Sequence, residues 1–118
     1  MPLPAILAAT LAASALPAAI EADIQCLAVF SLYPGKDSEE QAGITGAIMF
    51  YLGRIEGRAP RTQIEPRLRE LIADAEFREN RLPTHAQRCG NEMVIKGGEV
   101  QKIGNAIDAG QTPRGDRR

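Results

Sequence analysis

The chain has 118 residues, enough for one domain rather than two. Apolar residues make up 44% of it, too many for a disordered protein, and aromatic residues only 4%, which favours helices over strands. Its 14 basic and 15 acidic side chains nearly cancel, and a chain without a basic excess is poorly suited to bind nucleic acid or an acidic membrane surface.

Residues 1–22 differ from the rest of the chain. The first 20 residues contain no charged side chain, and alanine and leucine dominate them. An apolar run followed by small residues as far as Ala22 predicts a secretory signal peptide, although no Lys or Arg precedes the run. The alternative is a transmembrane anchor, but Pro4 and Pro17 leave roughly a dozen uninterrupted apolar residues where a span needs about 20. We therefore expect a signal peptide over 1–22, a periplasmic location, and no stable membrane insertion of the mature chain.

Two cysteines, Cys26 and Cys89, stand 63 positions apart. An even number of cysteines in an exported chain predicts a disulfide, and the alternative is two free buried thiols. A disulfide that closes a loop of this length stabilises a fold by roughly 4 kcal/mol in the chain-entropy model. We expect this bond to tie the first helix of the domain to the last.

The first predicted helix is short and runs from Asp23 to Leu32, because its apolar residues recur at helical spacing. The run Tyr33-Pro34-Gly35 should end it, since proline disfavours helix in the residue before it and glycine allows a turn.

The second helix has the clearest pattern and is predicted from Asp37 or Ser38, either of which can cap it, to near Gly57. Its apolar residues recur at intervals that place them on one face of a helix. They are Ile44, Ile48, Tyr51, Leu52 and Ile55. This stripe predicts a buried face, with Leu52 among its members.

A third helix is predicted from Glu65, with Pro66 at its first position, and it should dissolve between Phe77 and Pro83. Its apolar stripe consists of Ile64, Leu68, Leu71, Ile72 and Ala75.

A fourth helix is predicted from Thr84, which forms a capping box with Gln87. Its residues at alternating spacings of three and four are Cys89, Met93, Lys96, Val100, Ile103 and Ile107. The pair Gly97-Gly98 weakens it, so either a kink or a break is compatible with the sequence. We expect residues 23–109 to form an all-α domain, a bundle of about four helices closed by one disulfide, and 110–118 to be a disordered tail.

No group of residues predicts catalysis. The one histidine, His85, follows a helix cap and should be a surface residue, while a catalytic histidine needs a nucleophile or carboxylate in reach. One histidine and two bridged cysteines do not supply the three or four ligands of a zinc site. No glycine-rich segment matches a phosphate-binding loop. The sequence therefore predicts a protein that is not an enzyme and has no catalytic residue, metal site or cofactor.

Three arginines, Arg54, Arg58 and Arg61, recur at helical spacing near the end of the second helix. One interpretation is structural: they complement the helix dipole and pair with Glu56 or Glu65. The other is functional, because an arginine patch recognises an acidic partner or a carboxylate ligand. We treat the three as candidate partner contacts.

Three segments carry a resemblance that extends over most of the mature chain. They are DIQCL at 23–27, MFYLGRIEGR at 49–58 and AQRCGNEM at 86–93. Together they resemble small, uncharacterised exported helical proteins of alphaproteobacteria, notably sphingomonads, which implies a periplasmic location and no known activity. By layout alone the chain is also similar to acid-stress chaperones of the HdeA type and to helical periplasmic immunity proteins of the Tai type. The cysteine spacing here is longer than in those chaperones.

These observations lead to two hypotheses about function. The first is a non-enzymatic periplasmic protein that binds other proteins, as a stress chaperone does, by exposing apolar helix faces when the bundle loosens. The second is a specific inhibitor or immunity-type protein that presents a fixed, arginine-bearing surface to one partner. Fold analogy alone does not decide between them.

Overall fold

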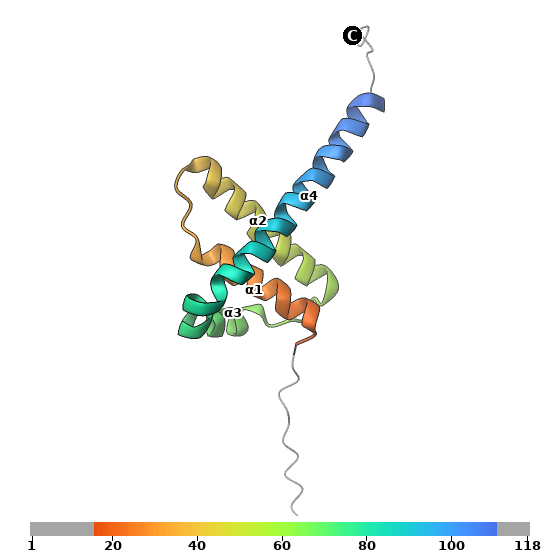
Figure 1. Cartoon of the computed structure of the whole chain (residues 1–118). Coiled ribbons are helices and arrows are strands. Elements are labelled where there is room, and N and C mark those ends of the chain that lie inside the picture. The colour runs from red at the N-terminus through yellow and green to blue at the C-terminus, as the bar shows by residue number, and fades with distance from the viewer. Residues whose placement is uncertain (1–15, 111–118) are drawn as a thin grey trace, which may run out of the picture.

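The structure, a computed structural model of the chain, describes residues 16–110 and is all-α over that range (Figure 1). Its elements in chain order are α1 (Ala18–Leu32), α2 (Ser38–Arg58), α3 (Ile64–Ala73), the π-helical segment η1 (Phe77–Arg81) and α4 (Leu82–Gly110). The prediction of an all-α bundle of about four helices is thus confirmed. Among the described residues, no helix is both long enough and apolar enough to cross a membrane.

Helix α1 lies at the centre of the bundle, and α2, α3 and α4 all contact it. Its residues face neighbours on several sides, so Ile24, Cys26, Ala28 and Val29 are almost completely buried. A mostly apolar helix is expected at such a central position, because most of its surface faces other helices. The fold therefore depends on α1 more than on any other helix.

The start of α1 differs from the prediction, because the helix begins at Ala18 and not at Asp23. The extra turn is fixed by packing: Ile20 is buried, and Glu21 forms an ion pair with Arg67 of α3. Residues 1–15 of the expected signal peptide lie outside the described residues, while its last five residues belong to this helix. A cut after residue 22 would remove both anchoring side chains.

Helix α2 begins where the capping pattern indicates. The Asp37 side chain accepts a hydrogen bond from the Glu40 backbone N–H at 2.8 Å, which satisfies one of the free donors of the first turn. In the preceding connection Gly35 has φ +65°, and a Cβ there would lie 2.7 Å from the Gln41 side chain, so only glycine fits easily.

The apolar stripe predicted for α2 includes one residue that is not buried. Tyr51 and Ile55 are completely buried and Ile48 is partly buried, but Leu52 is 36% exposed. The prediction that Leu52 belongs to the core is therefore wrong. The physical reason is that α2 contacts α1 along the line through Tyr51 and Ile55, and Leu52 lies at the edge of that line.

The segment after α3 also differs from the prediction, because the chain stays helical between Phe77 and Pro83. The π-helical segment η1 turns Phe77 into the core, where it is almost fully buried. Pro83 follows within this continuous helix, where it has no N–H to donate to the preceding turn. Short π-helical stretches accommodate such changes of register within a helix.

Helix α4 passes through Gly97-Gly98 without a break and ends at Gly110. Its first half contacts α1 and η1, while its second half extends away from the other helices (Figure 1). All residues from 97 to 110 are exposed. Most of the expected tail, residues 111–118, lies outside the described residues.

Candidate functional site

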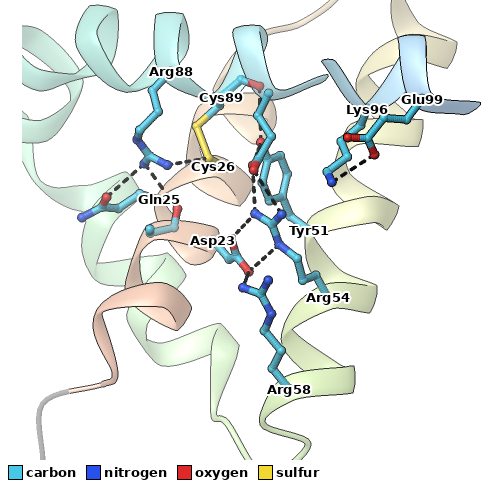
Figure 2. Close-up of polar contacts among 12 residues, drawn as sticks. Asp23, Gln25, Cys26, Tyr51, Arg54, Arg58, Arg88, Cys89, Lys96 and Glu99 are labelled. Carbon is cyan, nitrogen blue, oxygen red and sulfur yellow. Dashed lines mark hydrogen bonds and ion pairs between the residues drawn. A yellow bond between two sulfur atoms is a disulfide. The ribbon is translucent and has the colours of Figure 1, made fainter. Parts of the chain in front are cut away.

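The predicted disulfide is present. Cys26 of α1 and Cys89 of α4 are both completely buried, with an S–S distance of 2.05 Å and their Cα atoms 5.6 Å apart (Figure 2). The bond joins the central helix to the first half of α4, as expected from the sequence. It lies one helical turn from the most polar part of the interior.

That part is centred on Arg54, which lies on α2 and reaches carboxylates on two other helices (Figure 2). Its Nε and Nη2 donate to the two oxygens of Asp23 on α1, at 3.0 and 2.6 Å. Its Nη1 and Nη2 donate to the two oxygens of Glu92 on α4, at 3.1 and 2.8 Å. A planar guanidinium is suited to such paired contacts, and here one side chain connects three helices.

Tyr51 completes this group, which we call the polar cluster (Asp23, Tyr51, Arg54 and Glu92). The Tyr51 hydroxyl donates to Oε1 of Glu92 at 2.8 Å and lies 3.3 Å from the backbone oxygen of Cys89. The guanidinium carbon of Arg54 lies 5.3 Å from the centre of the Tyr51 ring and 4.8 Å from that of Phe50. Cation–π contact thus adds to the ion pairs.

The electrostatics of the polar cluster follow from this geometry. Hydrogen bonds to Asp23 and Glu92 raise the pKa of Arg54 above its ordinary value. Burial, followed by the bond to Glu92, raises the pKa of Tyr51. The hydrogen bond from Arg54 lowers the pKa of Glu92 below its ordinary value of 4.5, although partial burial opposes this. At neutral pH Glu92 is therefore an ionised carboxylate bound to the Arg54 guanidinium.

The Asp23 side chain is only 2% exposed. A charge so deeply buried is strongly unfavourable unless it is paired, and Asp23 has both the guanidinium contact of Arg54 and a more distant Arg58 Nη1, at 3.8 Å from Oδ2. Because both carboxylates of the polar cluster accept bonds from Arg54, neither is free to act as a general base. The arrangement is suited to fastening helices together.

The three arginines singled out from the sequence do not form one surface. Arg54 is mostly buried and fully engaged within the polar cluster, so it is not available to a partner. Arg58 is 52% exposed and touches the edge of the polar cluster. Arg61 is exposed and lies in the connection between α2 and α3. The candidate partner contact is thereby reduced to Arg58 and Arg61.

Arg61 lines an open groove of about 990 Å³ between the end of α2 and the start of α3. Across the groove, Arg67 forms ion pairs with Glu21 at 2.6 Å and with Glu70 at 3.0 Å. These bonds raise the pKa of Arg67, the bond to Glu21 most of all. The groove therefore contains two arginines, and among the described interactions only Arg67 is paired with carboxylates, whereas Arg61 is not.

His85 is half-buried, whereas a surface position was expected. Its ring stacks on that of Phe77 with the centres 5.4 Å apart, and its Nδ1 lies 3.3 Å from the Arg88 guanidinium. Burial, and then the positive charges of Arg88 and Arg81, lower the pKa of His85. The ring therefore has a packing role. Among residues 16–110, no three side chains of the metal-binding types lie together.

Sequence reasoning missed the polar cluster, because it assigned Arg54 to the surface and gave Asp23 and Glu92 no role. A signal was present: Asp23 is, with Glu21, one of two charged residues in the most apolar helix, and a buried charge in such a helix needs a partner. Nothing local in the sequence indicates that this partner is Arg54. Comparison of the chain with protein-family models, curated proteins and solved structures gave no match.

Proposed function

We propose that this chain is a non-enzymatic, periplasmic protein that binds other proteins through apolar helix surfaces exposed at acidic pH. One observation carries the proposal. Where α1, α2 and α4 meet, the interior ion pairs of Arg54 join the three helices. Their negative partners, Asp23 and Glu92, are both carboxylic acid side chains. Carboxylates lose their charge below about pH 4, so acid is expected to weaken the ion pairs of Arg54.

The direction of the pH effect follows from the pKa of Glu92. Because the folded chain lowers that pKa, Glu92 contributes stability above its ordinary value of 4.5, and this contribution is lost as the pH falls through the lowered value. Protonation of Glu92 would leave the partly buried guanidinium of Arg54 with one charged partner fewer. This loss weakens the bundle in acid and leaves it intact at neutral pH.

The disulfide determines which part of the bundle is freed. It keeps α1 joined to α4 at any pH, whereas α2 is joined to them through the polar cluster and apolar packing. Movement of α2 would uncover Ile24, Tyr51 and Ile55, which are completely buried in the neutral form. In acid the bundle would loosen while the disulfide limits how far the chain expands. The chain can then present these apolar residues to another protein that is unfolding.

The test compares the exported, disulfide-intact protein at pH 7 and at about pH 3. In acid it should bind an apolar dye and suppress the aggregation of an unrelated protein, and at pH 7 it should do neither. The Arg54→Ala variant should bind the dye already at pH 7, while the matched Arg58→Ala variant should behave as the parent. Dye binding in acid without any protection of the second protein would contradict the proposal.

A second function, that of a specific inhibitor or immunity-type protein, is favoured by the groove that Arg61 lines. The exposed guanidinium of Arg61, beside the prolines Pro60 and Pro66, provides a positive charge that can bind a carboxylate of a partner. Such a protein should retain one partner at neutral pH and lose it in Arg61→Glu but not in Arg78→Glu, an exposed control on η1. Equal retention by both variants would exclude the groove as the contact.

A further inference from the structure

The second half of α4 carries an apolar face that contacts no other described helix. Residues 93, 96, 100, 103 and 107 alternate at spacings of three and four, the repeat by which helices pair in coiled coils. The first of these residues, Met93, packs against the core of the bundle, and we call the other four the distal face (Lys96, Val100, Ile103 and Ile107). Val100, Ile103 and Ile107 are 68%, 61% and 52% exposed, although α4 is continuous beneath them.

We propose that the distal face is a dimer interface, in which α4 pairs antiparallel with α4 of a second copy of this chain. Two copies of the distal face can pair with each other, because each of its residues has a partner in the same face of the second copy. When Val100 is placed opposite Ile103 of the second copy, Lys96 falls opposite Ile107 and the same pairs recur on the other side of the two-fold axis. Every layer of the distal face then has a counterpart.

Lys96 decides the direction of pairing. In a parallel pair, the two copies of Lys96 would face each other at an interior position, and like charges at such a position repel. In the antiparallel pair, Lys96 packs its stem beside Ile107 and its ammonium group lies near Asp108 of the second copy. It can keep its present ion pair with Glu99, at 3.2 Å, at the rim of the interface.

Two glycines allow the backbones to approach. Gly97 and Gly104 lie beside the distal face, one heptad apart, and a Cβ built on either would meet nothing within 4 Å in the single chain. In the antiparallel register, Gly97 lies next to Gly104 of the second copy. Small residues at such positions permit close packing of two helices, which offers a reason for glycines inside an otherwise regular helix.

The position of the bundle favours the same direction. Because the distal part of α4 extends away from the other helices, an antiparallel pair places the two bundles at opposite ends (Figure 1). The paired length, 12 residues from Lys96 to Ile107, corresponds to about 18 Å. Such a contact is smaller than the interfaces of about 1,600 Å² that are typical of stable complexes. We therefore expect a dimer that dissociates on dilution.

Analytical ultracentrifugation of the disulfide-intact protein over a range of concentrations at pH 7 tests the proposal. The parent should shift from monomer to dimer, and Ile103→Glu should remain monomeric. Val94→Glu, a substitution on the same helix at an exposed position off the distal face, should dimerise as the parent does. A parent that stays monomeric at about 1 mM, or a dimer that persists in Ile103→Glu, would overturn the proposal.

Spin labels distinguish the two directions, since the native cysteines are bonded and only introduced ones react. In the antiparallel dimer, labels on Gln101→Cys lie near the axis and close together. Labels on Asn91→Cys lie about 30 Å apart along the helices. Equally short distances for both variants would indicate a parallel pair and would also overturn the proposal.

Discussion

The two halves of α4 have similar sequence patterns and different environments. In the first half, Cys89 is bonded to α1, and Glu92 accepts from Arg54 and Tyr51 of α2. In the second half, residues 97–110 are exposed although the apolar spacing continues. The spacing therefore does not determine which half joins the bundle. The first half is held by the disulfide, by the contact of Glu92 with Arg54, and by apolar packing of Leu82, Ala86 and Met93 against the core.

Within the polar cluster, the largest effect is expected from removing Arg54. Arg54→Ala leaves Asp23 buried without its principal partner, which should reduce the free energy of unfolding at pH 7 by about 3–5 kcal/mol. Urea unfolding monitored by circular dichroism measures this change. Arg58→Ala is the matched control, since Arg58 is half exposed and contacts Asp23 only at 3.8 Å. Comparable losses in the two variants would mean that Arg54 is not the centre of the polar cluster.

A smaller effect is expected from Tyr51→Phe, which keeps the ring and removes the hydroxyl bond to Glu92. Because Glu92 still accepts two bonds from Arg54, the loss should be about 1–2 kcal/mol. The variant should also raise the pKa of Glu92 towards its ordinary value, since the Tyr51 bond helps to lower it. Titration of the Glu92 carboxyl carbon by NMR would reveal an unchanged pKa if this bond were unimportant.

The smallest effect is expected on the outer edge of α2. Leu52→Asp should reduce the free energy of unfolding by less than about 1 kcal/mol, mostly through helix propensity, because Leu52 is partly exposed. Ile55→Asp, one turn away and completely buried, should prevent folding or lower the thermal midpoint sharply. Similar midpoints for the two variants would show that α2 buries a different face.

Much of the fold was predictable from local patterns. The cap at Asp37 and the end of α1 at Leu32 follow from residue types within a few positions of each helix end. The disulfide follows from the even number of cysteines. The start of α1 was not predictable in this way, because Ile20 and Glu21 are fixed by contacts with residues far along the chain. The continuous helix through Phe77–Arg81 likewise depends on burial of Phe77.

The candidate site was less predictable than the fold. Arg54 and Asp23 are 31 positions apart, and Arg54 and Glu92 are 38 apart, so no local pattern joins them. From the sequence, Arg54 belongs to a set with Arg58 and Arg61 at helical spacing. The packing of α2 on α1 divides this set, since it turns Arg54 inward and leaves Arg61 at the groove.

The most direct test of the account is the free energy of unfolding of the parent and of Arg54→Ala, measured between pH 7 and about pH 3. Arg54 stabilises the bundle through its charge contacts with Glu92 and Asp23. The difference between the two proteins should therefore be large at pH 7, shrink as the pH falls below the ordinary Glu92 value of 4.5, and be mostly lost at the acid end. A difference that stays constant across this range would contradict the account, because Arg54 would then act by packing and not by charge.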